Sequence, residues 1–169
     1  LLATLAQSAA YAEAFARPDP RMRAGHWIAD NVPDQAVVAI LHDAAPPVAK
    51  AGDKPLPADP WIFQLPPLNE KRLRLVGVRM RPADLLRTTP DYVICSDFQF
   101  PPLANRGPLD AIESAFLEQL HNTDLYEPLP FRNEPTLGGR RILIGAPPHD
   151  MRYADPGIVI YRRVGKKAQ

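Results

Sequence analysis

The sequence is poor in cysteine and has almost no net charge, and each of these features argues against a class of protein. Its 169 residues include one cysteine, Cys95, so no intramolecular disulfide can form and a disulfide-stapled scaffold is excluded. The formal net charge is +1, and lysine and arginine are scattered along the chain, which disfavours a nucleic-acid surface. Cys95 ends the apolar run 92–95 and has no histidine nearby in sequence, so we expect a small buried hydrophobe rather than a catalytic thiol.

Motifs that indicate particular chemistries are also missing. The chain contains no Gly-x-Gly-x-x-Gly or Walker-type phosphate loop and no Gly-x-Ser-x-Gly nucleophile elbow. Two His-Asp pairs are present, at 42–43 and 149–150, but neither has a further ligand at helical spacing, and we expect no metal site. The pair Gly138-Gly139 predicts a turn rather than an anion-binding loop. Nothing in the sequence predicts a cofactor.

The apolar stretch at the start of the chain, residues 1–16, is shorter than the about 20 apolar residues that are needed to cross a bilayer. The segment 1–18 opens with an Ala- and Leu-rich stretch that predicts a helix, although Gln7 and Glu13 interrupt it and it lacks the basic start and cleavage site of a signal peptide. Because the chain begins with Leu rather than Met, we expect a fragment or a processed form. Two interpretations of the helix stay open: an amphipathic packing helix, which the residues favour, or the last turns of a transmembrane helix.

The best-marked local structure is a helix that leads into a strand. Asp19 suits the N-cap and Pro20 the first helical position, where a missing N–H costs nothing. Apolar side chains recur at helical spacing after them, and Asn31 and Pro33 end the pattern. These apolar residues are Ala24, Trp27, Ile28 and Val32. The continuous apolar run 36–41 that follows is typical of a buried strand.

Strand-like and helix-like segments alternate along the rest of the chain. Further strands are expected at 72–78, 92–95, 125–131, 141–144 and 158–161, and further helices at 82–87 and 108–121, the last with an apolar face of Leu109, Ile112, Phe116 and Leu120. The alternation predicts an α/β fold: a layered, Rossmann-like, mixed but largely parallel sheet flanked by helices, with long proline-rich loops. The late strands have no clear helix between them, so part of the sheet should be antiparallel. We expect one soluble domain over 19–163 and a solvated basic tail at 164–169.

Proline is abundant, with 21 residues, and many of them lie in the segment 44–69. A loop of this length in a compact domain is usually functional or disordered. Trp61 and Phe63 lie within it, and such large apolar groups argue against simple disorder. One interpretation is a protein-interaction surface anchored by these two residues.

Polar residues follow two of the predicted buried strands. His42 and Asp43 come after the first, and Ser96 and Asp97 come after the other. Ligands of α/β sheets bind beyond the carboxyl ends of strands. If the two strands are neighbours, these four residues converge in a small polar cleft near the proline-rich loop, with Arg106 close by. The opposing interpretation is ordinary solvation of strand ends.

A set of short segments stands in a particular order along residues 19–163. It comprises Asp19-Pro-Arg21, Ala24, Trp27-Ile28, Asn31-Val-Pro33, the strand 37–41, Asp91–Ile94 with Ser96, Phe116, Leu120, Tyr126, Phe131 and the closing segment Pro156–Arg162. In this order the segments resemble the extracytoplasmic C-terminal domain of bacterial GT-C membrane glycosyltransferases, the superfamily of dolichyl-phosphate-mannose protein mannosyltransferases and aminoarabinose transferases. The long loop at 44–69 and the segment 135–155 depart from the family pattern.

The resemblance implies transfer of a sugar from a polyprenyl-phosphate donor to an acceptor outside the cytoplasm. In the family the catalytic acidic residues lie in loops of the membrane portion, so no catalytic residue is carried over to this chain. The chain would be a periplasmic domain on the outer face of the inner membrane, non-catalytic alone, that positions the acceptor or gates the active site. Its partners would be the transmembrane portion of the same polypeptide and a lipid-linked sugar or acceptor. The resemblance also favours the transmembrane interpretation of the first helix.

Two other functions stay open. A free-standing α/β enzyme or small-ligand-binding domain would use the cleft near His42, Asp43 and Asp97. A protein-interaction module would instead use Trp61 and Phe63 in the proline-rich loop.

Overall fold

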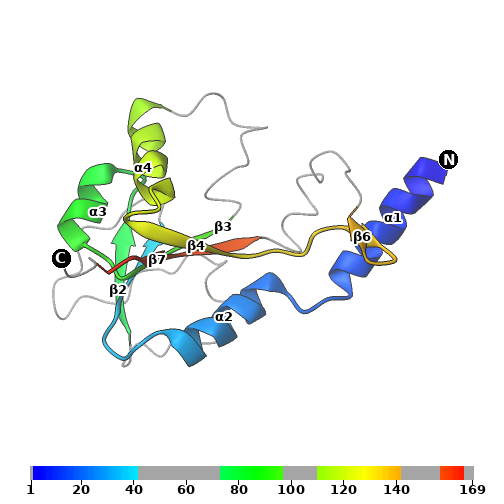
Figure 1. Cartoon of the computed structure of the whole chain (residues 1–169), viewed down its shortest axis with the longest axis horizontal. Coiled ribbons are helices and arrows are strands. Elements are labelled where there is room, and N and C mark those ends of the chain that lie inside the picture. Colours follow the sequence, from blue (N-terminus) through cyan, green and yellow to red (C-terminus); the bar gives the residue numbers. More distant parts are fainter. Residues whose placement is uncertain (1, 42–72, 97–109, 142–156, 166–169) are drawn as a thin grey trace.

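Helices and strands alternate along the chain much as the sequence predicts (Figure 1). The computed structural model describes residues 2–41, 73–96, 110–141 and 157–165. The helices are α1 (Leu2–Phe15), α2 (Pro20–Asn31), α3 (Pro82–Thr88) and α4 (Ala111–His121). The strands are β1 (Val37–Leu41), β2 (Arg74–Val78), β3 (Tyr92–Ser96), β4 (Tyr126–Phe131), β5 (Thr136–Leu137), β6 (Arg140–Arg141) and β7 (Ile158–Arg163). Within these ranges, no helix is both long and apolar enough to cross a bilayer.

Five of the strands form one sheet, in the order β2-β1-β3-β7-β4. β1 lies between β2 and β3 and is parallel to both, whereas β7 is antiparallel to its neighbours β3 and β4. The predicted α/β class is therefore confirmed, and the sheet is mixed, with two parallel and two antiparallel strand pairs. The antiparallel pairing expected of the late strands is confirmed as well.

Residues close together in the sequence determine α2, the helix that leads into β1. The Asp19 carboxylate accepts a hydrogen bond from the backbone N–H of Arg21 at 2.8 Å and so caps α2, and Pro20 occupies the first turn. Burial raises the pKa of Asp19, but the hydrogen bonds from Arg21 outweigh it and leave this pKa below its ordinary value. The predicted apolar face is packed in the core, with Ala24, Ile28 and Val32 buried and Trp27 partly buried against them.

Apolar side chains of the central strands alternate between two layers of core, one on each face of the sheet. Tyr92 and Ile94 of β3 belong to the layer covered by α2. Val93 and Cys95 belong to the layer covered by α3 and α4, where Phe116 is fully buried (Figure 1). Both faces of β3 are covered, which agrees with the continuously apolar sequence of its first four residues. Cys95 is 1% exposed, which confirms it as a buried residue.

α1 lies beyond one end of the sheet and packs on the hairpin formed by β5 and β6 (Figure 1). Gly138 and Gly139 form the hairpin turn with φ angles of +57° and +77°, a conformation that glycine adopts without steric cost. The predicted turn at these two glycines is confirmed, as is the predicted first helix. α1 and the β5–β6 hairpin are called the arm below.

α4 begins at Ala111, three residues later than the sequence pattern predicts. Asp110 is its N-cap, and the carboxylate accepts a hydrogen bond from the Glu113 N–H at 2.7 Å. This bond satisfies one of the backbone N–H donors that every helix start leaves unpaired, so the helix starts after Asp110.

Ile112 differs from the predicted pattern, because it is 53% exposed while Phe116 and Leu120 are fully buried. Each step of four residues rotates the side chain by about 40° around the helix axis, so Ile112 stands at the margin of the apolar stripe. The predicted strand at 141–144 starts within β6, and its remainder, like the loop 44–69, lies outside the described residues.

Candidate functional site

The carboxyl edge of the parallel strands is where the sequence predicts a polar cleft. β1 and β3 are neighbours, as that prediction requires, with Ile40 opposite Ile94. β1 ends at Leu41 and β3 ends at Ser96. Ser96 is 6% exposed and pairs with Ile158 of β7, so it belongs to the edge of the core rather than to open solvent.

The other predicted residues of the cleft and of the interaction surface lie outside the described residues. They are His42, Asp43, Trp61, Phe63, Asp97 and Arg106. The structure does supply the strand order at this edge, since the chain passes from β1 to β2 on one side and then to β3 on the other. In α/β sheets such a reversal of strand order is where ligands usually bind. The cleft at this edge stays a prediction, with Ser96 as its described member.

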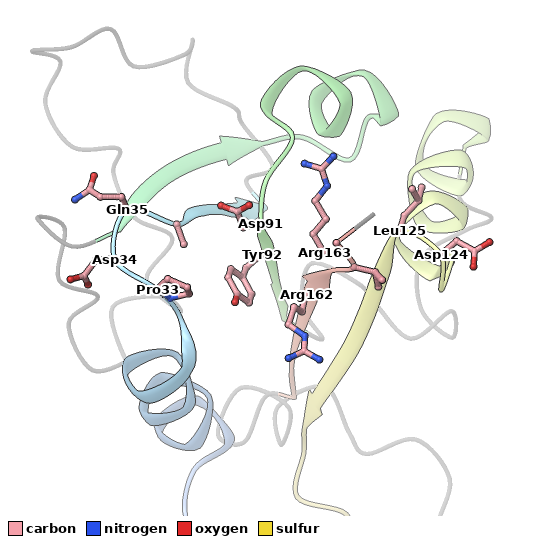
Figure 2. A pocket seen from close by; sticks show the side chains of 12 residues that line it. Pro33, Asp34, Gln35, Asp91, Tyr92, Asp124, Leu125, Arg162 and Arg163 are labelled. Atoms are coloured by element: carbon pink, nitrogen blue, oxygen red, sulfur yellow. The ribbon is translucent and has the colours of Figure 1, made fainter. Parts of the chain in front are cut away.

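At the opposite, amino-terminal edge of the same strands lies an open groove of about 640 Å³ (Figure 2). Its walls come from four segments: the turn 33–36 between α2 and β1, the start of β3, the turn 124–125 before β4, and residues 162–165 at the end of β7. Binding sites for small ligands commonly have volumes of about 300–1,000 Å³, so the groove has room for a ligand of that size.

Hydrogen bonds between strand ends hold these segments together. The Asp91 N–H donates to the Val37 carbonyl at 2.8 Å, and the Asp91 carboxylate accepts from the Val37 N–H at 2.8 Å. The Arg163 N–H donates to the Asp91 carbonyl, and the Val164 N–H donates to the Leu125 carbonyl, both at 2.8 Å. The groove is therefore built on the ends of the sheet ladder rather than on independent loops.

The turn between α2 and β1 is tight. The Ala36 N–H donates to the Pro33 carbonyl at 3.2 Å, and Gln35 has a φ of +66°. Left-handed backbone is uncommon for residues with a side chain, and it persists where neighbouring structure fixes it. Asp34 and Gln35 consequently extend from the turn into solvent at the rim of the groove (Figure 2).

The groove carries charges of both signs. The ionisable residues that line it are Asp34, Asp91, Asp124, Arg162 and Arg163. Arg162 is paired with Glu127 of β4, and Arg163 donates to the Thr89 carbonyl at 3.2 Å. Figure 2 shows the two arginine side chains extending in opposite directions from the end of β7. Mixed charge of this kind is complementary to a zwitterionic or neutral polar ligand rather than to a polyanion.

Apolar side chains form the rest of the groove wall. Tyr92 is largely buried there and contacts Trp27 edge to face, with ring centroids 6.2 Å apart. Leu125 and Val164 are 41% and 38% exposed, so part of their apolar surface is open to a ligand. A few polar groups beside apolar surface is the usual composition of a binding site.

The reactive side chains of the core are held in unreactive states. Burial raises the pKa of the Cys95 thiol well above its ordinary value, so the thiol stays protonated at neutral pH. Burial also raises the pKa of Tyr161 to about 12, and its hydroxyl lies 3.1 Å from Nε2 of His121. Within the described ranges, no group of three or more His, Cys, Asp or Glu side chains is placed to hold a metal ion.

Sequence reasoning missed the groove because the general rule for α/β sheets points to the carboxyl edge. A signal for it is nevertheless present. Asp34, Asp91 and Asp124 stand shortly before β1, β3 and β4, three strands that run in the same direction. Residues that precede such strands meet at one edge of the sheet.

Comparison of the chain with protein-family models, with curated proteins and with solved structures gave no significant match.

Proposed function

We propose that this chain is a periplasmic domain of a membrane glycosyltransferase that takes its sugar from a polyprenyl-phosphate donor. On its own the domain is non-catalytic, and it positions the acceptor or gates the active site of the membrane portion. The sequence resemblance over 19–163 motivates this proposal. The observation that carries it is α1, a helix whose exposed residues are all uncharged and which projects from the side of the sheet where β4 ends (Figure 1).

A positioning role requires a fixed junction between α1 and the rest of the domain, and hydrogen bonds at the junction provide one. The Asn133 amide donates to the Pro18 carbonyl at 3.2 Å, and Arg23 donates to the Asn133 side-chain oxygen at 3.3 Å. Arg17 donates to the Glu134 carbonyl at 3.1 Å. These contacts join both ends of the link between α1 and α2 to the segment between β4 and β5, and they support a fixed position of α1.

A Rossmann-like, largely parallel sheet is part of the same proposal. It is supported by the common direction of β1, β2, β3 and β4 and by the position of β1 between β2 and β3. In Rossmann-like sheets the ligand crevice lies at the carboxyl edge, beside such a reversal of strand order. β4 runs from this edge into the hairpin that packs on α1, so an acceptor bound there would lie on the side of the membrane portion.

The gene upstream of the Leu1 codon tests the proposal. Several hydrophobic stretches of about 20 residues each, ending near Leu1, would support a membrane enzyme whose outer domain is this chain. A start codon or a cleavable signal peptide at this position would overturn it.

A transfer assay tests the non-catalytic assignment separately. Membranes that contain the complete polypeptide should transfer labelled sugar from a polyprenyl-phosphate donor, whereas the 169-residue chain alone should not. Turnover by the chain alone would overturn this part of the proposal and direct attention to the polar edges of the sheet.

The groove at the amino edge favours a second function, the binding of a small zwitterionic or neutral polar ligand by a domain that acts on its own. NMR titration with free amino acids and neutral sugars tests it. Leu125→Arg fills the groove and should abolish the shifts, while Leu137→Arg, at a residue of similar exposure (43% against 41%) in the hairpin, should leave them unchanged. Shifts that survive Leu125→Arg would rule out the groove as the binding site.

A further inference from the structure

One side of α1 presents uncharged and partly apolar surface to solvent. Leu5 and Phe15 are 60% and 44% exposed, and the exposed residues between them are one serine and two alanines. The single acidic residue of the helix, Glu13, lies on the hairpin side. Its carboxylate accepts a hydrogen bond from the Thr136 hydroxyl at 2.6 Å and pairs with Arg17 at 2.9 Å. The exposed side of α1 therefore has no charge of its own.

Positive charge gathers where the arm meets the domain. Arg17 and Arg23 are hydrogen-bonded to the segment 132–134, and Arg132 and Arg140 are exposed beside them on that segment and on the hairpin. These four residues are called the arginine collar below. Residues 2–23 and 132–141 together contain six arginines and three carboxylates, although the whole chain has a net charge of only +1. These two segments of the chain therefore carry a net charge of +3.

From these two observations we propose that the arm docks onto an anionic lipid surface. The exposed side of α1 lies at the boundary between headgroups and acyl chains, and the arginine collar binds lipid phosphates. The 14 residues of α1 give a helix about 21 Å long, which suits a position at this boundary. Apolar burial and attraction of basic residues to anionic lipid are the two contributions that hold peripheral helices at membranes. The inference deepens the proposed function by naming the surface that the domain contacts.

A bilayer fits the exposed side of α1 better than a second copy of this chain does. A standard protein interface buries about 800 Å² on each partner, and its centre is rich in large apolar side chains. The exposed side of α1 offers two large apolar residues, Leu5 and Phe15, among small ones. A lipid surface requires less apolar area because the arginine collar adds electrostatic attraction, which a symmetry-related collar of the same sign would not supply.

Co-sedimentation of the 169-residue chain with vesicles tests the proposal. The chain should bind phosphatidylcholine vesicles that contain phosphatidylglycerol, and should bind vesicles of phosphatidylcholine alone at least about threefold less. Raising the ionic strength should weaken the binding to the anionic vesicles, because salt screens the attraction. Equal binding to both vesicle types, or binding to neither, would overturn the proposal.

Paired variants locate the contact. Leu5→Asp should reduce binding to anionic vesicles by at least about threefold, while Leu86→Asp, at a 66% exposed leucine on α3, should not change it. Arg140→Glu should reduce binding, while Arg74→Glu at the start of β2 should not. Circular dichroism checks that each variant is folded. Equal losses in a variant of the arm and in its control would overturn the proposal.

Three further outcomes separate the alternatives. A dimer that Leu5→Asp converts into monomers, measured by light scattering, would show that a second copy covers α1 and would overturn lipid docking. Hydrophobic spans encoded upstream of Leu1 together with no vesicle binding would overturn docking and leave the proposed function standing. Vesicle binding together with a start codon at Leu1 would support docking and overturn the proposed function.

Discussion

Asp91 and Val37 are joined by two hydrogen bonds of 2.8 Å, one through the backbone of Asp91 and one through its carboxylate. The side chain thus continues the ladder between β1 and β3 by one further bond, at the point where both strands begin. The Asp91 carbonyl accepts a third hydrogen bond, from the Arg163 N–H of β7. A single residue therefore aligns three strands of the sheet and forms part of the groove at their amino edge.

Replacing Asp91 should lower the free energy of unfolding. Asp91→Ala should cost about 1 kcal/mol, because the bond from the Val37 N–H to the carboxylate is exposed and is therefore weaker than a buried hydrogen bond to a charged group. Asp91→Asn keeps an acceptor oxygen and should cost less. Asp124→Ala is the matched control, since Asp124 lines the same groove and is exposed, and it should change stability by less than about 0.5 kcal/mol. Urea denaturation measures all three, and equal losses at Asp91 and Asp124 would refute the role given to the Asp91 carboxylate.

The thiol of Cys95 should be inert in the folded protein. Burial leaves the thiol 1% exposed and raises its pKa. A reagent therefore has little access to the sulfur, and little of the reactive thiolate forms at neutral pH. Labelling with a thiol-reactive maleimide at neutral pH should be slow in buffer and fast in denaturing urea. Rapid stoichiometric labelling of the native chain would show that the strand end near Cys95 is open.

Elements with short-range causes could be predicted from the sequence. The cap at Asp19, the proline after it and the apolar stripe that ends at Val32 determine α2 locally, and the run 36–41 has enough apolar residues to be a buried strand. The burial of Cys95 follows from the same kind of run in β3. In each case the deciding residues lie within one helix or one strand and its ends.

The arrangement of the sheet could not be predicted in the same way. β7 lies between β3 and β4, and the residue pairs that place it there, such as Ile94 with Ile160, are far apart in the sequence. Pairing over such separations depends on how whole faces pack, which no local pattern encodes. Ile112 also departs from the predicted pattern, because it stands at the margin of the apolar stripe of α4 and is 53% exposed.

The sequence likewise predicts one part of the candidate site and not another. Ser96 could be placed at a strand end from the sequence, and the neighbouring position of β1 and β3 supports the reasoning that selected it. The amino-edge groove was not predicted, because it joins turns from four parts of the chain, and the aspartates that precede three of its strands line one groove only after the strands pair.

Tyr11→Phe should keep or increase the stability of the protein. The Tyr11 hydroxyl is buried, and in the part of the chain that the structure describes it has no hydrogen-bond partner. Removing an unsatisfied hydroxyl avoids its desolvation cost, so a gain of up to about 1 kcal/mol is expected. Tyr161→Phe is the contrast, because that hydroxyl contacts His121 at 3.1 Å, and it should cost about 1 kcal/mol. Thermal unfolding of both variants measures the difference, and equal losses would mean that the Tyr11 hydroxyl is satisfied in solution.

Acid should loosen the arm through Glu13. The hydrogen bond from Thr136, followed by that from Arg17, lowers the pKa of Glu13 from its ordinary value of 4.5. Because the folded-state pKa is the lower one, these contacts contribute stability above the unfolded pKa, and this contribution is lost as the pH falls through the folded pKa. An NMR titration of the Glu13 carboxyl carbon should therefore give a midpoint below 4.5. Thr136→Val removes the larger cause and should move the midpoint upward, and an unchanged midpoint in this variant would mean that the helix and the hairpin are not in contact through this pair.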